Sequence, residues 1–203
     1  GIYKPDEGRI LYNGIDITGK SPHEIVKLGL AKTFQIPALF NSLSVAENLL
    51  ILQPNNPGEK LLNSLFKKKW VHAEKQALRK LSEILNMLEL KLQCNKRVIE
   101  LSGGQLKLLE LSKILMLDPK VCLLDEPVGS IHPILANKIF TYITEMRNNF
   151  GKTFLIVEHR LDIAFQYADY VYVLANGKIL CEGTPKEVTE RKELYEVYLS
   201  HLK

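Results

Sequence analysis

The sequence predicts an α/β fold with a mostly parallel β-sheet and helices on both faces of that sheet. Two short apolar runs, at residues 121–124 and 154–157, have the continuous hydrophobicity of strands buried on both sides. Each run is followed by a segment with helical character, and strands that alternate with helices are typical of parallel sheets. Two Asn-Gly pairs, at 13–14 and 176–177, predict antiparallel β-hairpins in addition.

The first part of the chain combines a hairpin with a helical region. Beside the first Asn-Gly pair, Ile15 and Ile17 alternate with polar residues, as expected for a half-buried strand. Ser21 is a candidate N-cap for the next helix, and Pro22 is a candidate for its first residue. The pattern from Val45 to Glu89 is mostly helical. One helix face there is predicted to carry four leucines three or four residues apart, Leu78, Leu81, Leu85 and Leu88.

Basic residues are concentrated in this helical region. They are Lys60, Lys67, Lys68, Lys69, Lys75, Arg79 and Lys80. The pattern fits an ordinary solvated helix surface, and it also fits a patch close to a membrane.

Helices and strands alternate after Leu101. Helices are predicted from about Gln105 to Leu117, from about Pro133 to Phe150, from about Leu161, and from Pro185 toward Leu202. The apolar strands lie between these helices, which is the order expected of a parallel sheet.

Composition sets wide limits on function. The 203 residues suit one globular domain, or a core with a small subdomain, and the net charge of +4 permits nucleic acid or anionic lipid as a partner without indicating either. Three widely spaced cysteines, Cys94, Cys122 and Cys181, suggest a reducing compartment and are interpreted as small core residues. No apolar run approaches the ~20 residues that a membrane-spanning helix needs.

Acidic side chains follow both apolar runs. Asp125 and Glu126 end the first run, and Glu158 and His159 end the second. Ligands bind at the carboxyl ends of strands in open parallel sheets, and acids beside an imidazole suit a metal ion and a phosphate. Asp125 is therefore a candidate Mg²⁺ ligand and Glu126 a candidate general base. An ordinary strand that ends in a polar turn remains the alternative.

The stretch from Leu101 to Gln105 predicts an anion site at a helix start. Gly103 and Gly104 let backbone N–H groups approach a phosphate, and Ser102 can cap the helix or donate its hydroxyl to the anion. A Gly-Gly loop that caps an ordinary helix is the alternative interpretation.

These motifs together resemble the ABC-type ATPases. "LSGGQ" is similar to their signature motif and "VCLLDEP" to their Walker B strand, while Gln35 matches the Q-loop and His159 the switch histidine. The order of the four motifs is that of the family. The resemblance implies a P-loop NTPase-like ABC ATPase core with an added antiparallel β-hairpin. It also implies a helical signature subdomain, with the core at 1–35 and 105–203 and the subdomain at 36–104.

Finer details resemble one branch of this family. "AKTFQ", "LSGGQLKLLEL" and "DEPVGSIHP" look like the ATPase subunits of branched-chain amino-acid importers, with urea importers and lipopolysaccharide exporters as near neighbours. The loop after Walker B, Gly129 to His132, departs from the S-A-L-D found in many members and is more similar to the branched-chain subgroup, so the aspartate contact across the dimer is not carried over from the family.

The resemblance implies roles for individual residues in hydrolysis of Mg²⁺-bound ATP. Asp125 and Gln35 would bind Mg²⁺, Glu126 would be the catalytic base, and His159 and Gln35 would act at the γ-phosphate and the attacking water. Leu101, Ser102, Gly103, Gly104 and Gln105 would hold ATP across a dimer.

The resemblance also implies partners and a location. The partners would be a second ATPase subunit in a homo- or heterodimer, two transmembrane permease subunits and, indirectly, a periplasmic or extracellular substrate-binding protein. The chain would lie peripherally on the cytoplasmic side of the plasma (inner) membrane.

One further pattern is interpreted as a decoy. Gly14, Gly19, Lys20 and Ser21 match the phosphate-loop pattern G-x-x-x-x-G-K-[ST], but Asp16 and β-branched residues lie between the glycines. We expect a hairpin there. The true Walker A loop is expected to precede Gly1, so that the sequence is either an N-terminally truncated copy or a degenerate remnant.

Two other functions are weighed against transport. A nucleic-acid-associated ABC ATPase would carry long coiled coils between Gln35 and Leu101, and this interval leaves no room for them, so no nucleic-acid partner is expected. A non-catalytic fragment that cannot bind ATP alone is the other alternative.

Overall fold

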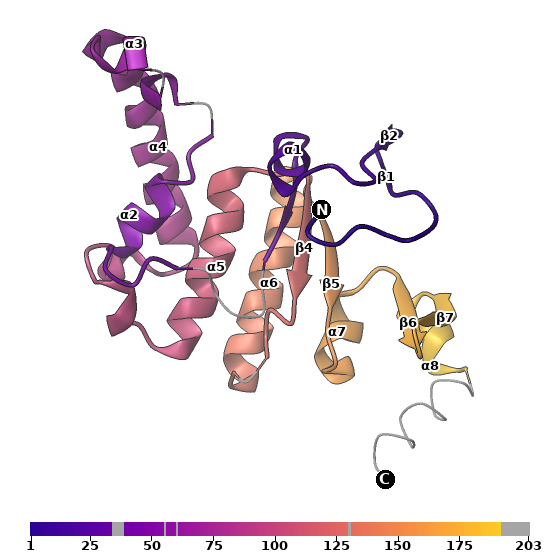
Figure 1. Cartoon of the computed structure of the whole chain (residues 1–203). Helices are drawn as coiled ribbons and strands as arrows, with labels where there is room; N and C mark the ends of the chain where they lie inside the picture. Colours follow the sequence, from indigo (N-terminus) through magenta and orange to yellow (C-terminus); the bar gives the residue numbers. More distant parts are fainter. Residues whose placement is uncertain (34–38, 55, 60, 130, 192–203) are drawn as a thin grey trace. The chain divides into compact units, whose positions relative to one another are not determined.

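The structure, a computed structural model, describes residues 1–33, 39–54, 56–59, 61–129 and 131–191 (Figure 1). The chain forms two compact units, Gly1–Val157 and Glu158–Lys203.

A parallel three-stranded sheet lies in the first unit. Its strands are β3 (Leu30–Lys32), β4 (Val121–Asp125) and β5 (Thr153–Val157), in the order β3-β4-β5. The register pairs Ala31 with Cys122 and Asp125 with Val157. The predicted parallel sheet is thus confirmed. The sequence did not indicate β3, because three residues with one buried side chain carry too little pattern.

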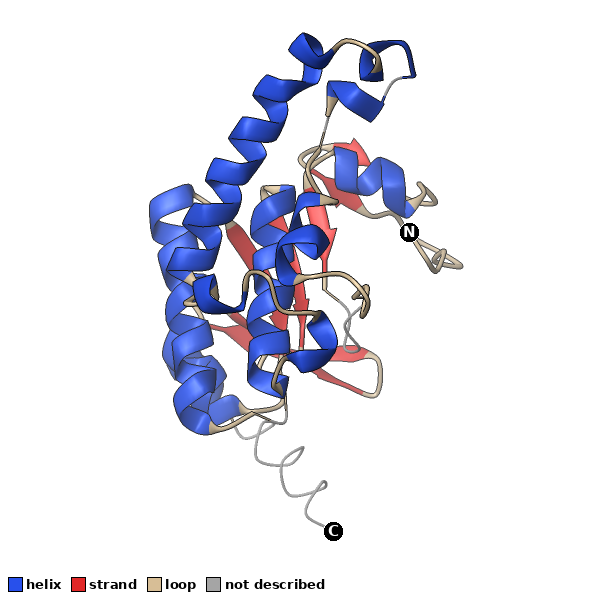
Figure 2. Ribbon diagram, turned by 90° about the vertical axis from the view of Figure 1, so that its left-hand side faces the viewer, coloured by secondary structure: helices blue, strands red, loops and turns tan. Residues whose placement is uncertain are grey.

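Two long helices accompany this sheet (Figures 1 and 2). Helix α5 (Gly103–Leu117) contacts β3, and helix α6 (Pro133–Phe150) contacts β5. Their inward side chains, such as Leu109, Met116 and Ile139, are almost completely buried. Burial of each such side chain contributes about 1.5–3 kcal/mol, so these contacts make up much of the core that holds the sheet in place.

The N-terminal part forms the predicted hairpin and helix. Strand β1 (Leu11–Tyr12) pairs antiparallel with β2 (Ile15–Asp16), and both turn residues, Asn13 and Gly14, have positive φ. Helix α1 (Pro22–Lys27) begins after Ser21, which forms a capping box with Glu24. The predicted cap and first helical residue are therefore confirmed, and the helix ends before Gly29, whose φ of 95° turns the chain into β3.

The region between β3 and α5 is mostly helical, as predicted. Its elements are α2 (Val45–Leu50), η1 (Pro57–Glu59), α3 (Leu61–Ser64), α4 (Lys67–Met87), η2 (Lys91–Gln93) and η3 (Val98–Glu100). Helix α4 contacts both α2 and α5. Leu81, Leu85 and the C-cap Leu88 are buried, but Leu78 is 52% exposed. The buried face of α4 is formed by Ala77, Leu81, Ile84 and Leu85, and Leu78 lies about 100° around the helix from Ala77.

The second unit contains the other predicted hairpin. Strands β6 (Val171–Ala175) and β7 (Lys178–Gly183) pair antiparallel around Asn176 and Gly177, both with positive φ. Helix α7 (Leu161–Tyr167) precedes them and α8 (Pro185–Thr189) follows. The predicted continuation of the last helix to Leu202 lies mainly outside the described residues. Among the helices described in the two units, none is long and apolar enough to cross a membrane.

Candidate functional site

The first candidate carboxylate is fixed at the end of the central strand. The backbone N–H of Asp125 donates to the hydroxyl of Thr33 (3.1 Å), and the N–H of Thr33 donates to the carbonyl of Leu123 (2.9 Å). The Asp125 carboxylate lies 3.1 Å from the amine of Lys32, and its side chain is 34% exposed. A partly exposed carboxylate on a backbone held at this edge is available to a cation and fits the donor set that Mg²⁺ prefers.

The second carboxylate follows on a constrained turn. Glu126 has a φ of 47°, which is uncommon for a residue other than glycine. Its N–H donates to the carbonyl of Val157 (2.9 Å), and its own carbonyl accepts from the N–H of Gly129 (3.1 Å) and from the amine of Lys107 (3.4 Å). Left-handed backbone outside glycine persists only where the surroundings impose it, and these bonds from β5, the following loop and α5 do so.

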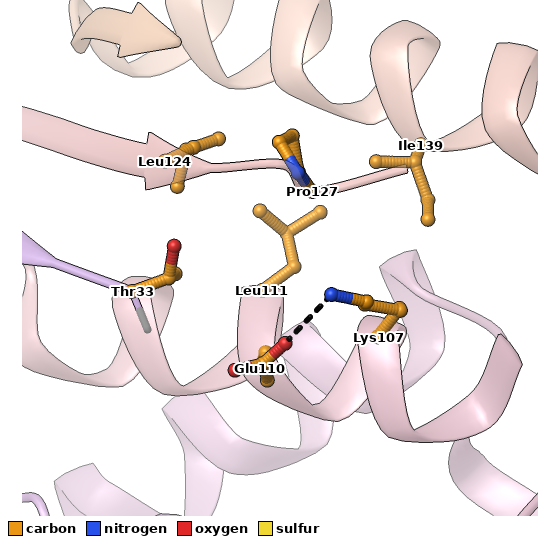
Figure 3. Close-up of a pocket in the computed structure, with 7 residues that line it drawn as sticks. All are labelled: Thr33, Lys107, Glu110, Leu111, Leu124, Pro127 and Ile139. Atoms are coloured by element: carbon orange, nitrogen blue, oxygen red, sulfur yellow. Dashed lines mark ion pairs between the residues drawn. The ribbon is translucent and has the colours of Figure 1, made fainter. Parts of the chain in front are cut away.

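A small pocket lies behind this turn, between the end of β4 and helix α5 (Figure 3). It is lined by Thr33, Lys107, Glu110, Leu111, Leu124, Pro127 and Ile139. Its volume of about 10 Å³ holds roughly one water molecule, so it is not a nucleotide pocket.

An ion pair occupies one wall of the pocket. Lys107 and Glu110 lie 3.6 Å apart, and their side chains are 15% and 10% exposed. Burial raises the pKa of Glu110, and the neighbouring lysines partly oppose that rise. The pair therefore places a partly buried cation against the backbone carbonyl of Glu126.

The Ser102–Gln105 loop opens helix α5 as predicted. Ser102 is the N-cap: its N–H donates to the Gln105 side chain (3.0 Å), and its hydroxyl accepts from the N–H of Gln105 (3.3 Å). Ser102 and Gly103 are exposed, whereas Leu101 is buried. The capping interpretation is thus confirmed. Binding of an anion by the first amides of this helix remains a prediction.

The two glycines of this loop have different surroundings. A Cβ atom on Gly103 would meet open space, but one on Gly104 would lie 2.3 Å from a methyl group of Leu135 on α6. Gly104 therefore allows the start of α5 to approach α6 closely, and Gly103 leaves the outer surface of the loop uncovered.

Two further predicted residues are not placed in this group by the structure. Gln35 is outside the described residues. His159 is exposed and belongs to the second unit, where its carbonyl accepts from the N–H of Leu161 (3.1 Å). The predicted roles of Gln35 and His159 beside Glu126 remain predictions.

Four residues of the site were not predicted from the sequence: Lys32, Thr33, Lys107 and Glu110. Lys107 and Glu110 did leave a signal, because they are opposite charges three residues apart in the otherwise apolar stretch "LKLLEL". Lys32 and Thr33 contact residues of β4, a strand that is distant in the sequence. Such contacts cannot be predicted from a local sequence pattern.

The phosphate-loop pattern near the N-terminus is a decoy, as expected. Asp16 lies on β2, and its carboxylate accepts from the N–H of Thr18 (2.9 Å). The N–H and hydroxyl of Ser21 both donate to the carboxylate of Glu24, so an anion already occupies the start of α1. A phosphate would meet a negative charge at this position.

Comparison with known proteins agrees with this geometry. The family model described as "ABC transporter" matches residues 1–129. A probable branched-chain amino acid transport ATP-binding protein LivG from Archaeoglobus fulgidus is 41% identical over 98% of this chain and 76% of its own length. The LivG of Methanocaldococcus jannaschii is 43% identical over 98% of this chain and 78% of its own length.

Solved structures give the same result. An ATP-binding cassette of an ABC transporter, solved in its ADP conformation, is 42% identical with a TM-score of 0.81, covering 98% of this chain and 79% of the other. Fold, motif order and sequence identity agree, and the chain belongs to the ABC transporter family as an ATP-binding subunit.

Proposed function

We propose that this chain hydrolyses ATP to drive the import of amino acids, and specifically of branched-chain amino acids. The observation that carries the proposal is the pair Asp125 and Glu126, held by backbone hydrogen bonds at the carboxyl end of the central parallel strand. The names of the LivG relatives support the substrate.

The two carboxylates have different tasks in this proposal. Asp125 would hold the Mg²⁺ ion of the nucleotide, because its carboxylate is partly exposed at the end of β4, and the ion would replace the amine of Lys32 as the cation beside it. Glu126 accepts the proton of the attacking water, and His159 and Gln35 orient the γ-phosphate and that water. Magnesium-bound ATP supplies the phosphoryl group, and the protein contributes mainly positioning.

The Ser102–Gln105 loop contacts ATP that is bound to a second ATPase subunit. Exposed backbone at the start of a 15-residue helix offers N–H donors and a positive dipole end to a phosphate. Two subunits in head-to-tail contact would each complete the site of the other. Their closure on ATP and opening after hydrolysis would drive the permease.

A groove beside this loop is the candidate contact for a transmembrane permease subunit. It has a volume of about 290 Å³ and is lined by Leu39, Asn41, Val98, Ile99, Leu101 and Leu106. An apolar groove suits an apolar segment of a partner. The complete assembly includes a substrate-binding protein outside the cell, and the chain lies on the cytoplasmic side of the membrane.

Transport in proteoliposomes tests the proposal. We expect the assembled complex to hydrolyse ATP and to accumulate labelled leucine, isoleucine or valine, with uptake lost when ATP is omitted. Hydrolysis with uptake of urea alone would contradict the substrate, and a complex without ATP hydrolysis would contradict the mechanism.

A further inference from the structure

Four large apolar side chains are exposed within six residues of the helical region. Leu61 is 83% exposed, Leu62 75%, Leu65 77% and Phe66 57%. They lie on α3 and at the start of α4, and Figure 1 shows α3 beside the first turn of that long helix. Scattered apolar residues on a surface are ordinary, but a contiguous group of this size indicates an interaction site.

Basic residues directly follow the apolar group. Lys67 and Lys68 are both exposed and begin the first turn of α4. No aspartate or glutamate occurs in the sequence from Leu61 to Ala73. The residues 61–68, called the apolar–basic patch below, thus combine apolar surface with uncompensated positive charge.

Local contacts hold the patch in shape. The indole N–H of Trp70 donates to the carbonyl of Ser64 (3.1 Å), and the N–H of Phe66 donates to the carbonyl of Asn63 (3.0 Å). A Cβ on Gly58 would lie 3.3 Å from Trp70, so the indole packs closely on η1. Trp70 contacts η1, while the leucines are exposed to solvent. Because the segment is already ordered, binding would cost little conformational entropy.

We infer that the apolar–basic patch binds directly to the surface of an anionic lipid bilayer. The leucines and Phe66 enter the interface between headgroups and acyl chains, while Lys67 and Lys68 contact lipid phosphates. Charge complementarity favours this occupant, because apolar residues with neighbouring lysines and no acids are typical of peripheral membrane contacts. The inference does not depend on ATP hydrolysis, so it can fail while the proposed function stands.

Trp70 reports on this contact, because it is the one tryptophan of the sequence. We expect this chain to co-sediment with vesicles of phosphatidylglycerol and phosphatidylcholine, and its tryptophan emission to shift to shorter wavelength. Binding should weaken in vesicles of phosphatidylcholine alone and as salt is raised, because exposed charges are screened.

Paired variants locate the contact. Lys67→Glu with Lys68→Glu should weaken binding by at least about fivefold per lysine. Leu61→Ser with Leu65→Ser should weaken it by about tenfold or more. The matched controls are Lys91→Glu with Lys96→Glu, and Leu92→Ser with Leu174→Ser, which change exposed residues of the same types elsewhere and should bind as the parent does.

Circular dichroism must show the same helical content in every variant compared. Absence of binding to anionic vesicles by the unaltered chain would overturn the inference, as would equal effects of the patch variants and their controls. Binding of purified permease to the apolar–basic patch, without any binding of the chain to vesicles, would also overturn the inference. It would identify a protein as the partner of the patch.

Discussion

At the scale of single residues, the site depends on the backbone as much as on side chains. Glu126 occupies a left-handed conformation, held by hydrogen bonds to Val157, Gly129 and Lys107. Such a conformation costs about 1–3 kcal/mol in other settings, so these bonds must compensate for it. The carboxylate is therefore attached to backbone whose position is fixed.

The role of Glu126 is tested by its amide variant. Glu126→Gln keeps the size of the side chain but removes the proton acceptor, so ATP hydrolysis by the assembled transporter should fall by about 10²–10⁴. Nucleotide binding by a full-length version that carries the Walker A loop, measured by titration calorimetry, should be retained. Near-normal hydrolysis would remove Glu126 as the base.

The two signature glycines should differ in their tolerance of a side chain. Gly104→Val would meet Leu135, whereas Gly103→Val would extend into open space. Urea unfolding should show Gly104→Val to be less stable than Gly103→Val by about 1–3 kcal/mol, because overpacking forces the α5–α6 contact apart. Equal stabilities would mean that Leu135 moves aside without cost.

At the scale of elements, the burial of strand β4 lowers the reactivity of the cysteine thiol that it carries. Cys122 is 1% exposed, and burial raises its pKa to about 12 from the usual 9.0. Near pH 8 its thiolate fraction should be lower by about 10³ than that of an ordinary thiol. Mass spectrometry after alkylation should find Cys94 and Cys181 modified well before Cys122. Rapid modification of Cys122 in the folded chain would contradict the burial of β4.

Helix α5 carries a buried carboxyl whose ionisation opposes folding. Burial raises the pKa of Glu110 in the folded chain above the usual 4.5, so folding takes up a proton just above that pH. Stability should therefore fall as pH rises through this window. Glu110→Gln removes this pH dependence. Loss of the ion pair with Lys107 changes the free energy of unfolding by an amount that does not vary with pH in this range.

The comparison of the two proteins by urea unfolding checks this sign. The parent should lose stability relative to Glu110→Gln as pH rises from about 4.5. A gain of stability by the parent over the same range would mean that the ion pair with Lys107 outweighs the cost of burial.

The elements show which parts of the fold were predictable. The bounds of α6 were predicted from its helical pattern and from Pro133. Helix α5 was predicted from about Gln105 and begins two residues earlier, at Gly103, directly after the candidate cap Ser102. Strand β3 has no such signal, since its identity depends on pairing with β4, far away in the sequence. Helix ends can be predicted from capping residues nearby in the sequence. Pairing between distant strands cannot be predicted in this way.

The site shows the same division. Asp125 and Glu126 were predicted because an apolar strand directly precedes them. The contact of Lys107 with Glu126 was not, because it requires the packing of α5 against the end of β4. The candidate carboxylates were thus identified from the sequence, and the residues that hold their backbone in place were found from the structure.

At the scale of the whole molecule, we propose that the complete ATP site is formed by two subunits. In the proposed function, one subunit would supply Asp125 and Glu126 to its own nucleotide and offer its Ser102–Gln105 segment to the nucleotide of another. The exposure of Ser102 and Gly103 is consistent with such a partner. The apolar–basic patch would add a direct contact with lipid to the contacts made through the permease.

The most direct test is an experimental structure of the assembled transporter with Glu126→Gln and bound ATP. We expect Asp125 to contact the Mg²⁺ ion and residue 126 to face the γ-phosphate. We also expect Ser102 and the amides of Gly103 and Gly104 to reach the same phosphate from the opposite subunit. A Ser102–Gln105 loop that faces away from the nucleotide, or touches the ATP of its own subunit, would contradict the central claim.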